Sequence, residues 1–188
     1  PLRQAPCYDR LKELGAVFGQ KFGWERANWF APSKELQKDD WSFRRSNWFE
    51  HVGNECKNVS ENAGLLDMSA FAKCRISGPG AEEFLDNLVA NKIPKKNGRV
   101  NLCHALNTAG GVHSEFTIAK EKENSFYLVS AGAFQRLDHD WIHKWMPKDG
   151  SVTYENLTNS MGVLVLAGPK SRDILSKITR TDLSNENF

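Results

Sequence analysis

The sequence predicts an α+β protein: a split β-α-β lobe of the ferredoxin-like type, preceded by an aromatic N-terminal arm and followed by the start of a second, similar lobe. Short apolar runs bounded by glycine or proline alternate with segments whose apolar residues recur at helical spacing. The tetrapeptide Ile-Ser-Gly-Pro at 76–79 also recurs as Leu-Ala-Gly-Pro at 166–169. In both copies we expect a buried strand before the glycine, and a helix with proline in its first turn after it.

The first 49 residues predict an arm or linker. Apolar residues recur at helical spacing between Tyr8 and Phe22, but glycines interrupt the pattern and weaken the prediction of one helix. The segment 23–49 is expected to be irregular, and its phrase Arg-Ala-Asn-Trp-Phe at 26–30 is echoed by Arg-Ser-Asn-Trp-Phe at 45–49. These aromatic pairs predict an arm that inserts into a surface of this chain or of another.

Residues 50–158 carry the pattern of the first lobe, and residues 159–188 that of a second lobe that is cut short. One apolar stripe predicts a helix over 49–63, which Gly64 ends, and 65–69 are expected to link it to the first strand. The other predicted elements are strand 71–77, a helix from 78 with Ala81, Phe84, Leu85, Leu88 and Val89 on one face, strands 100–106, 112–119 and 126–130, a helix with the stripe Phe134, Leu137, Trp141 and Trp145, strands 152–157 and 161–167, and a last helix from 168. Because the second lobe lacks returning strands, we expect the chain to be a piece of a longer functional unit.

Composition excludes several classes of function. With 40% apolar and 26% charged residues, the 188-residue chain has enough apolar side chains for a globular core. The net charge of +2 is too balanced to predict a nucleic-acid partner. The longest apolar stretch, 161–168, is far shorter than the roughly 20 residues of a membrane span, so no membrane partner is expected. The cysteines are scattered without a Cys-x-x-Cys pair, which favours reduced thiols in the cytoplasm of a bacterium or the mitochondrial matrix of a eukaryote.

Three patterns in the sequence are candidates for ligand sites. His139 and His143 form the pattern His-Asp-Trp-Ile-His, which resembles the zinc helix His-Glu-x-x-His. Its acidic residue is Asp instead of Glu, no third ligand is evident, and both histidines lie off the apolar stripe, so no metal site is predicted. Gly15, Gly19 and Gly23 lack the spacing and the preceding strand of a dinucleotide site. The strands 100–106 and 112–118 lack the aromatic residues that stack bases, which leaves RNA binding a minor alternative.

The hairpin around the Asn-Thr-Ala-Gly-Gly turn at 107–111 is the most informative segment. Strand alternation places Ser114, Phe116 and Ile118 on one face, and His113 and Glu115 on the other. A carboxylate beside an imidazole just beyond a tight turn could hold a group that transfers a proton. The alternative is a solvent-exposed pair on an outward strand face, which is the commoner arrangement.

Four segments carry a resemblance to a known family: Phe-Gly-Trp-Glu-Arg-Ala-Asn-Trp-Phe-Ala-Pro at 22–32, Gly-Leu-Leu-Asp-Met-Ser at 64–69, Gly-Val-His-Ser-Glu-Phe-Thr-Ile at 111–118 and the last eight residues from 181. Together they resemble the folate-binding half of dimethylglycine and sarcosine dehydrogenases, which is similar to the glycine cleavage T-protein, an aminomethyltransferase. The first phrase points to the dehydrogenase branch. The turn at 107–111 is shared with the T-protein branch.

The resemblance implies tetrahydrofolate as the cofactor in this chain and FAD only in a separate upstream domain. It implies that Glu115 is the catalytic carboxylate near the folate N5, where the family usually carries Asp. It places Phe71, Leu102, Val129 and Ala131 at cofactor-binding positions, with Leu102 where the T-protein branch often has Tyr and Ala131 where the family has Asn. No metal ligand is implied.

The resemblance also implies a function. The chain is expected to be part of the aminomethyltransferase-like region that passes a one-carbon unit from an oxidised N-methyl amine to tetrahydrofolate. Its implied partners are a flavin-dependent oxidoreductase domain or subunit and, in the full enzyme, a small N-methylated amine. The segment alone is expected to be inactive. The alternatives are a folate-binding module without catalysis and a structural module whose aromatic arm docks on a flavin domain.

Overall fold

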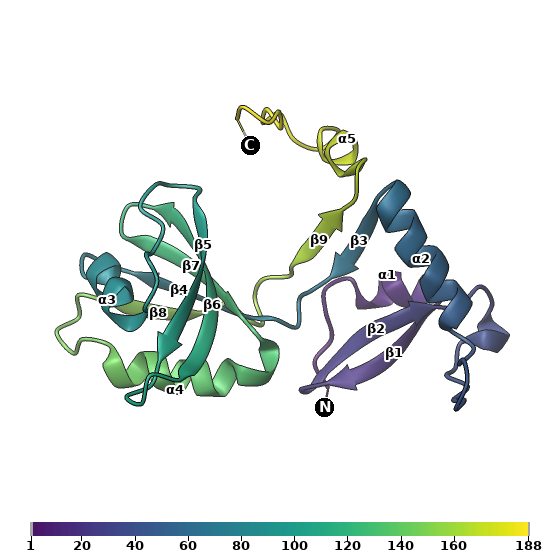
Figure 1. The fold of residues 1–188 in the computed structure, drawn as a ribbon, viewed down its shortest axis with the longest axis horizontal. Helices are drawn as coiled ribbons and strands as arrows, with labels where there is room; N and C mark the ends of the chain where they lie inside the picture. Colours follow the sequence, from purple (N-terminus) through teal and green to yellow (C-terminus); the bar gives the residue numbers. More distant parts are fainter. Residues whose placement is uncertain (1, 188) are drawn as a thin grey trace. The chain divides into compact units, whose positions relative to one another are not determined.

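The computed structural model describes residues 2–187 and contains the mixture of helices and sheets that the sequence predicts. Contacts between Cα atoms divide the chain into two compact units (Figure 1). Residues 1–69 and 163–188 form the first unit, and residues 70–162 form the second. This division differs from the expected boundaries after residues 49 and 158, because the chain leaves the first unit at residue 69 and returns to it at residue 163.

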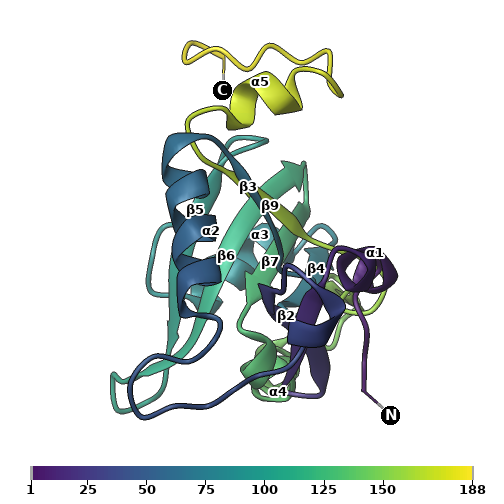
Figure 2. The ribbon, with the colours of Figure 1, turned by 90° about the vertical axis from the view of Figure 1, so that its right-hand side faces the viewer.

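The second unit is a five-stranded antiparallel sheet with two helices, and Figure 2 shows its twisted strands. The strand order is β5-β6-β7-β4-β8. Its elements are β4 (Ala72–Ser77), α3 (Ala81–Leu88), β5 (Val100–Leu106), β6 (Val112–Lys122), β7 (Ser125–Ser130), the short 3-10 turn η2 (Gly132–Phe134), α4 (Gln135–Trp145) and β8 (Thr153–Asn156). The sequence therefore predicted each strand of this unit to within a few residues.

Without β5, the element order of the second unit is β4-α3-β6-β7-α4-β8, a β-α-β-β-α-β sequence. Strand β7 lies between β4 and β6 and is antiparallel to both, so β4 and β6 run in the same direction with one strand between them. The β-α-β unit is thus split by β7. Strand β5 pairs with the outer side of β6 and forms one edge of the sheet.

The core of the second unit lies between the helices and one face of the sheet. The predicted face of α3 is buried, and its Leu85 is 0% exposed. It belongs to one cluster with alternate residues of the strands, among them Ile76, Phe116 and Ile118. Each large apolar side chain buried in this way stabilises the fold by about 1.5–3 kcal/mol. The alternation predicted for residues 114–118 is confirmed.

The predicted orientation of α4 was wrong. Its expected apolar face is largely exposed, with Phe134 at 56%, Leu137 at 44% and Trp145 at 50%. The buried residues of the helix are instead Asp138 and Ile142, one turn apart. Asp138 accepts a 2.6 Å hydrogen bond from the Ser130 hydroxyl at the end of β7, and this bond holds the Asp138 side of the helix toward the sheet.

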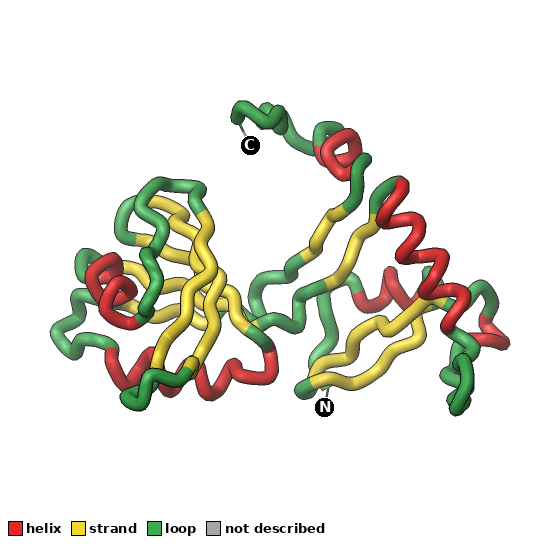
Figure 3. Tube along the Cα trace, in the orientation of Figure 1, coloured by secondary structure: helices red, strands yellow, loops and turns green. Residues whose placement is uncertain are grey.

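The first unit contains two separate two-stranded ribbons, drawn in yellow in Figure 3. Its elements are α1 (Tyr8–Glu13), β1 (Ala16–Lys21), β2 (Trp24–Phe30), the 3-10 turn η1 (Lys34–Leu36), α2 (Phe49–Glu61), β3 (Gly64–Asp67), β9 (Leu164–Ala167) and α5 (Ser171–Leu175). Strand β1 pairs with β2, and β3 pairs with β9. The segment 65–69, expected as a link, therefore contributes most of a strand.

The N-terminal segment is a helix followed by a β-hairpin, which corrects both the helical pattern expected to reach Phe22 and the irregular arm expected from residue 23. Gly15 ends the helix with φ +93, and a Cβ atom there would lie 2.5 Å from the carbonyl oxygen of Ala31. Phe22 and Gly23 both have positive φ and form a two-residue turn that suits a hairpin. One aromatic residue of the expected arm, Trp29, is buried within this chain. It is 2% exposed and packs in a cluster with Val17.

Candidate functional site

Three of the predicted site residues, Leu102, Glu115 and Val129, lie on the face of the five-stranded sheet opposite α3 and α4. In register, Leu102 of β5 is paired with Thr117 of β6, Thr117 with Val129 of β7, and Val129 with Lys73 of β4. Paired residues of neighbouring strands point to the same face. Leu102 and Val129 therefore belong to one row across the sheet.

The neighbouring row on this face contains Glu115. Its partner on β5 is His104. Phe71 directly precedes β4 and Ala131 directly follows β7, at the end of the sheet where Ala72 pairs with Ser130. Leu102, Glu115 and Val129 thus share one face of the sheet, and Phe71 and Ala131 lie just beyond the ends of two of its strands.

The imidazole beside Glu115 is not the one that the sequence indicated. His104 Nε2 lies 3.0 Å from Glu115 Oε2, and the His104 backbone N–H donates to Asn91 Oδ1 at 2.7 Å. His113 instead contacts the Ser114 hydroxyl through Nδ1 at 2.8 Å and stacks on Trp141 with ring centroids 3.9 Å apart. His104 was missed because it faces Glu115 only across the ladder. The pairing also depends on a register shift between Ala105 and Leu106, without which His104 would face Ser114.

The surroundings of the His104–Glu115 pair are apolar and accessible. The Glu115 side chain is 63% exposed and the His104 side chain 31%. Leu102, in the neighbouring row on this face, is 54% exposed. Phe71 and Val129 are half-buried, and Ala131 is exposed. The apolar residues of such a surface can contact the ring of a planar ligand. A hydrogen-bonded carboxylate beside them can orient a nitrogen of that ligand and accept its proton.

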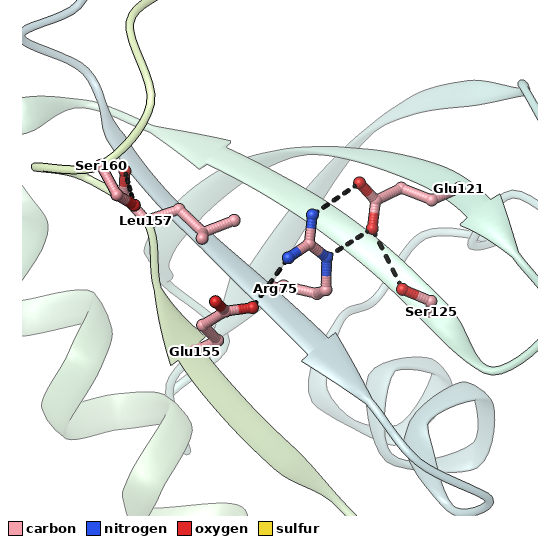
Figure 4. Close-up of polar contacts among 6 residues, drawn as sticks. All are labelled: Arg75, Glu121, Ser125, Glu155, Leu157 and Ser160. Atoms are coloured by element: carbon pink, nitrogen blue, oxygen red, sulfur yellow. Dashed lines mark hydrogen bonds and ion pairs between the residues drawn. The ribbon is translucent and has the colours of Figure 1, made fainter.

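An ion-pair network lies farther along the same face (Figure 4). Arg75 of β4 donates to Glu121 of β6 through Nε at 2.7 Å and Nη2 at 3.0 Å, and to Glu155 of β8 through Nη1 at 2.7 Å. The Ser125 hydroxyl also donates to Glu121 at 3.0 Å. The hydrogen bonds from Arg75 are the main cause that lowers the pKa of Glu121, and bonds to Glu121 and Glu155 raise the pKa of Arg75. Both acceptors are anionic, so the network ties three strands together.

Polar groups also lie beneath the sheet, next to α4. The thiol of Cys74 is buried, and desolvation is the first cause that raises its pKa to about 12. Desolvation likewise raises the pKa of Tyr154. Asp138 Oδ1 is buried and has no hydrogen-bond partner among residues 2–187. Cys74 and Tyr154 are therefore protonated at neutral pH. All three groups lie where α4 packs against the sheet and do not form an open site.

Each unit also has a cavity of its own. In the second unit, a cavity of about 330 Å³ lies between α3, α4 and the turn after β5, with Leu106 and Asn107 in its wall. In the first unit, a cavity of about 540 Å³ is lined by residues of β2, α2, β3 and β9. Glu115 lines neither cavity.

Over residues 2–187, no group of three or more His, Cys, Asp or Glu side chains is placed to hold a metal ion. In the same part of the chain, none of the helices combines the length and the apolar character that crossing a membrane requires.

Comparisons with known proteins agree with the resemblance drawn from the sequence. Residues 7–188 match the model of the family described as the GCVT N-terminal domain. The mitochondrial dimethylglycine dehydrogenase of Mus musculus is 39% identical over 188 residues, which cover 99% of this chain and 21% of that protein. The mitochondrial pyruvate dehydrogenase phosphatase regulatory subunit of Mus musculus is 33% identical over 192 residues, covering 100% of this chain and 22% of that protein.

A solved structure shows the same fold. The glycine cleavage system aminomethyltransferase T from Bartonella henselae superposes with a TM-score of 0.77 at 22% identity, covering 94% of this chain and 44% of that one. The chain spans about a fifth of the length of the curated relatives that it matches. The predicted likeness to the T-protein and to the dimethylglycine dehydrogenase family is confirmed, and the chain belongs to the GCVT N-terminal domain family.

Proposed function

We propose that this chain is the tetrahydrofolate-binding part of a dimethylglycine or sarcosine dehydrogenase-type enzyme, where a one-carbon unit from an oxidised N-methyl amine passes to tetrahydrofolate. The chain is an aminomethyltransferase-like domain by family. The observation that supports the proposal is that Glu115, Leu102 and Val129, from three strands, lie on one face of one sheet, with Phe71 and Ala131 just beyond the strand ends. Local sequence spacing does not impose this arrangement.

The side chains on that face fit the chemistry of a reduced pterin. Bound tetrahydrofolate supplies the amine nitrogen that accepts the one-carbon unit. Glu115 is the residue that takes the proton from that nitrogen and balances positive charge beside it. His104 orients the Glu115 carboxylate through the 3.0 Å contact. Leu102, Val129 and Phe71 supply apolar contacts for a ring, which fits their partial exposure.

The rest of the reaction takes place outside this chain. We place amine oxidation in a flavin-dependent domain or subunit with FAD, and the small N-methylated amine binds there. The relatives named as mitochondrial dehydrogenases support a matrix location if the source is a eukaryote, and the cytoplasm is proposed for a bacterium.

The test uses the full-length enzyme that contains this chain. Glu115→Gln keeps the size of the side chain and removes its charge. We expect amine oxidation to continue and formation of methylene-tetrahydrofolate to fall by about 10²–10⁴-fold, with free formaldehyde released instead. Glu115→Asp should retain part of the transfer. The matched control is Glu123→Gln, at the exposed turn between β6 and β7, which should leave both activities unchanged.

The 188-residue chain alone is proposed to bind tetrahydrofolate weakly and to be inactive, because the apolar surface beside Glu115 is open. Calorimetry with tetrahydrofolate measures this directly. If the isolated chain binds tetrahydrofolate with micromolar affinity, the proposal of weak binding is wrong. The role of Glu115 in the full enzyme is tested separately by Glu115→Gln.

The second candidate is a module without catalysis, which binds folate or docks on a partner. The observation that favours it is the relative named as a regulatory subunit. The match covers 100% of this chain and 22% of that relative. This candidate predicts that Glu115→Gln changes neither product. Its docking form predicts that Trp41→Ser with Phe43→Ser weakens assembly of the full enzyme, because Trp41 is 77% exposed and Phe43 is fully exposed.

A further inference from the structure

Two histidines of α4 form a stacked pair that the proposed function does not use. His139 and His143 lie one helical turn apart, with ring centroids separated by 3.9 Å and ring planes inclined by 26°. Tyr154 of β8 contacts both rings with its own ring edge-on, at centroid distances of 5.3 Å and 4.7 Å. The His139 side chain is 39% exposed and His143 is exposed, so the pair is accessible from solvent.

The hydrogen bonds of this pair determine which nitrogens carry protons. His139 Nδ1 lies 3.1 Å from Asp140 Oδ1, and His143 Nδ1 lies 2.8 Å from the carbonyl oxygen of His139. A carboxylate and a carbonyl can only accept, so each Nδ1 carries its hydrogen. In the neutral rings, both Nε2 atoms then present lone pairs that lie in the ring planes. Because the rings are stacked, the exposed side chains must turn out of the stack before both lone pairs can reach one ion. The Asp140 acceptor is itself held by Arg136 Nε at 2.9 Å and 3.0 Å, which keeps it ionised and in place.

We propose that His139 and His143 bind one divalent transition-metal ion through their Nε2 atoms, with Cu²⁺ bound most tightly and Ni²⁺ and Zn²⁺ more weakly. Two imidazoles are the donor set that these ions favour, and Cu²⁺ leads the general affinity order. Asp140 has the role of the outer carboxylate that orients a metal-bound histidine and raises its basicity.

The site is open rather than a closed structural centre. No third His, Cys, Asp or Glu joins the pair within the described chain, so water fills the remaining coordination positions. Tyr154 packs edge-on against both rings and is not proposed as a ligand. This differs from the zinc helix weighed from the sequence, in which the acidic residue acts as a base. Here Asp140 acts on His139, and the inference does not depend on the folate function.

The test adds Cu²⁺ or Zn²⁺ to the 188-residue chain. Calorimetry measures the binding of each ion, and electron paramagnetic resonance identifies the atoms that bind Cu²⁺. We expect one Cu²⁺ per chain, a spectrum with coupling to two nitrogens, and weaker binding of Zn²⁺. His139→Gln and His143→Gln should each weaken Cu²⁺ binding by at least about tenfold, and Asp140→Asn by a similar or smaller factor. The matched controls His104→Gln and His51→Gln alter other partly exposed histidines and should bind as the unaltered chain does.

Circular dichroism establishes that each variant is folded, and bound Cu²⁺ should raise the Tm of the unaltered chain but not that of His143→Gln. The proposal is overturned if Cu²⁺ binds no more tightly than about 1 mM, if either helix variant binds as well as the unaltered chain, or if His104→Gln or His51→Gln causes an equal loss. The last result would mean adventitious binding spread over the surface histidines.

Discussion

Gly78 and Gly168 adopt the same left-handed backbone conformation, with φ values of +116 and +113, at the ends of β4 and β9. Each carbonyl accepts a 3.0 Å hydrogen bond from the first residue of the following helix, Ala81 or Ser171. The proline lies inside this turn, and each helix begins three residues later than the sequence suggested. A Cβ atom at Gly78 would lie 2.4 Å from the carbonyl oxygen of Ser151, and one at Gly168 would lie 2.6 Å from the carbonyl oxygens of Asn62 and Val59.

Gly78→Ala and Gly168→Ala should therefore each destabilise the chain by about 1–3 kcal/mol, because the φ value is unfavourable for alanine and the backbone blocks its methyl group. Urea unfolding followed by circular dichroism measures the loss. The matched control is Gly53→Ala on α2, where nothing lies within 4 Å of the added Cβ, and it should be neutral or stabilising. Equal effects at all three positions would contradict the assignment.

Arg75→Gln should cost about 1 kcal/mol, because it removes hydrogen bonds to two partly exposed carboxylates and leaves Glu121 and Glu155 close to an uncharged amide. Arg75→Lys should recover only part of this loss, because one ammonium group cannot reproduce the forked contact with Glu121. Equilibrium unfolding at pH 7 is the measurement. Full recovery by lysine would indicate that charge alone matters there.

The same network predicts a dependence of stability on pH. Arg75 lowers the pKa of Glu121 below its ordinary value of 4.5, so this pair stabilises the folded chain fully above pH 4.5. That contribution is lost as the pH falls through the lower pKa of the folded state. Between pH 4.5 and about 2.5, the free energy of unfolding should fall more steeply for the unaltered chain than for Arg75→Gln. Parallel slopes would refute the contribution of Arg75.

Trp29 is expected to dominate the small core of the first unit. Its ring packs with Val17 and Ala31, and its Nε1 donates to Asp39 at 2.8 Å. Trp29→Ala should cost about 3–5 kcal/mol, and Trp29→Phe less, because phenylalanine keeps most of the ring contact and loses the hydrogen bond. Trp41→Ala is the control, since a side chain that is 77% exposed should change stability by no more than about 0.5 kcal/mol. Urea unfolding ranks the three variants.

The thiols should differ sharply in reactivity. Cys56 is exposed, whereas Cys74 and Cys103 are buried and burial raises the pKa of both. Alkylation with iodoacetamide at pH 8, read by mass spectrometry of peptides, should modify Cys56 first and leave Cys74 and Cys103 unmodified until urea unfolds the chain. Rapid modification of Cys74 in the folded chain would contradict the packing of α4 against the sheet.

The sequence by itself determined the features that arise between near neighbours in the chain. Alternation along 112–118 identified which side chains of β6 face the core, and the glycine-proline corners after β4 and β9 were recognisable because glycine alone tolerates their φ. The resemblance also named Leu102, Glu115 and Val129, which the strand register places on one face of the sheet.

The tertiary structure decided the relationships between distant segments. The pairing of β3 with β9 joins residues about 100 positions apart, and no local pattern specified it. The hydrogen bond from Ser130 to Asp138 decided which side of α4 is buried, against the apolar stripe that suggested otherwise. Register across β5 and β6 decided that His104, and not His113, contacts Glu115. The physical reason is that hydrophobic periodicity specifies which side of an element is apolar, whereas the partner of that side depends on packing and hydrogen bonds that exist only once separate segments have come together.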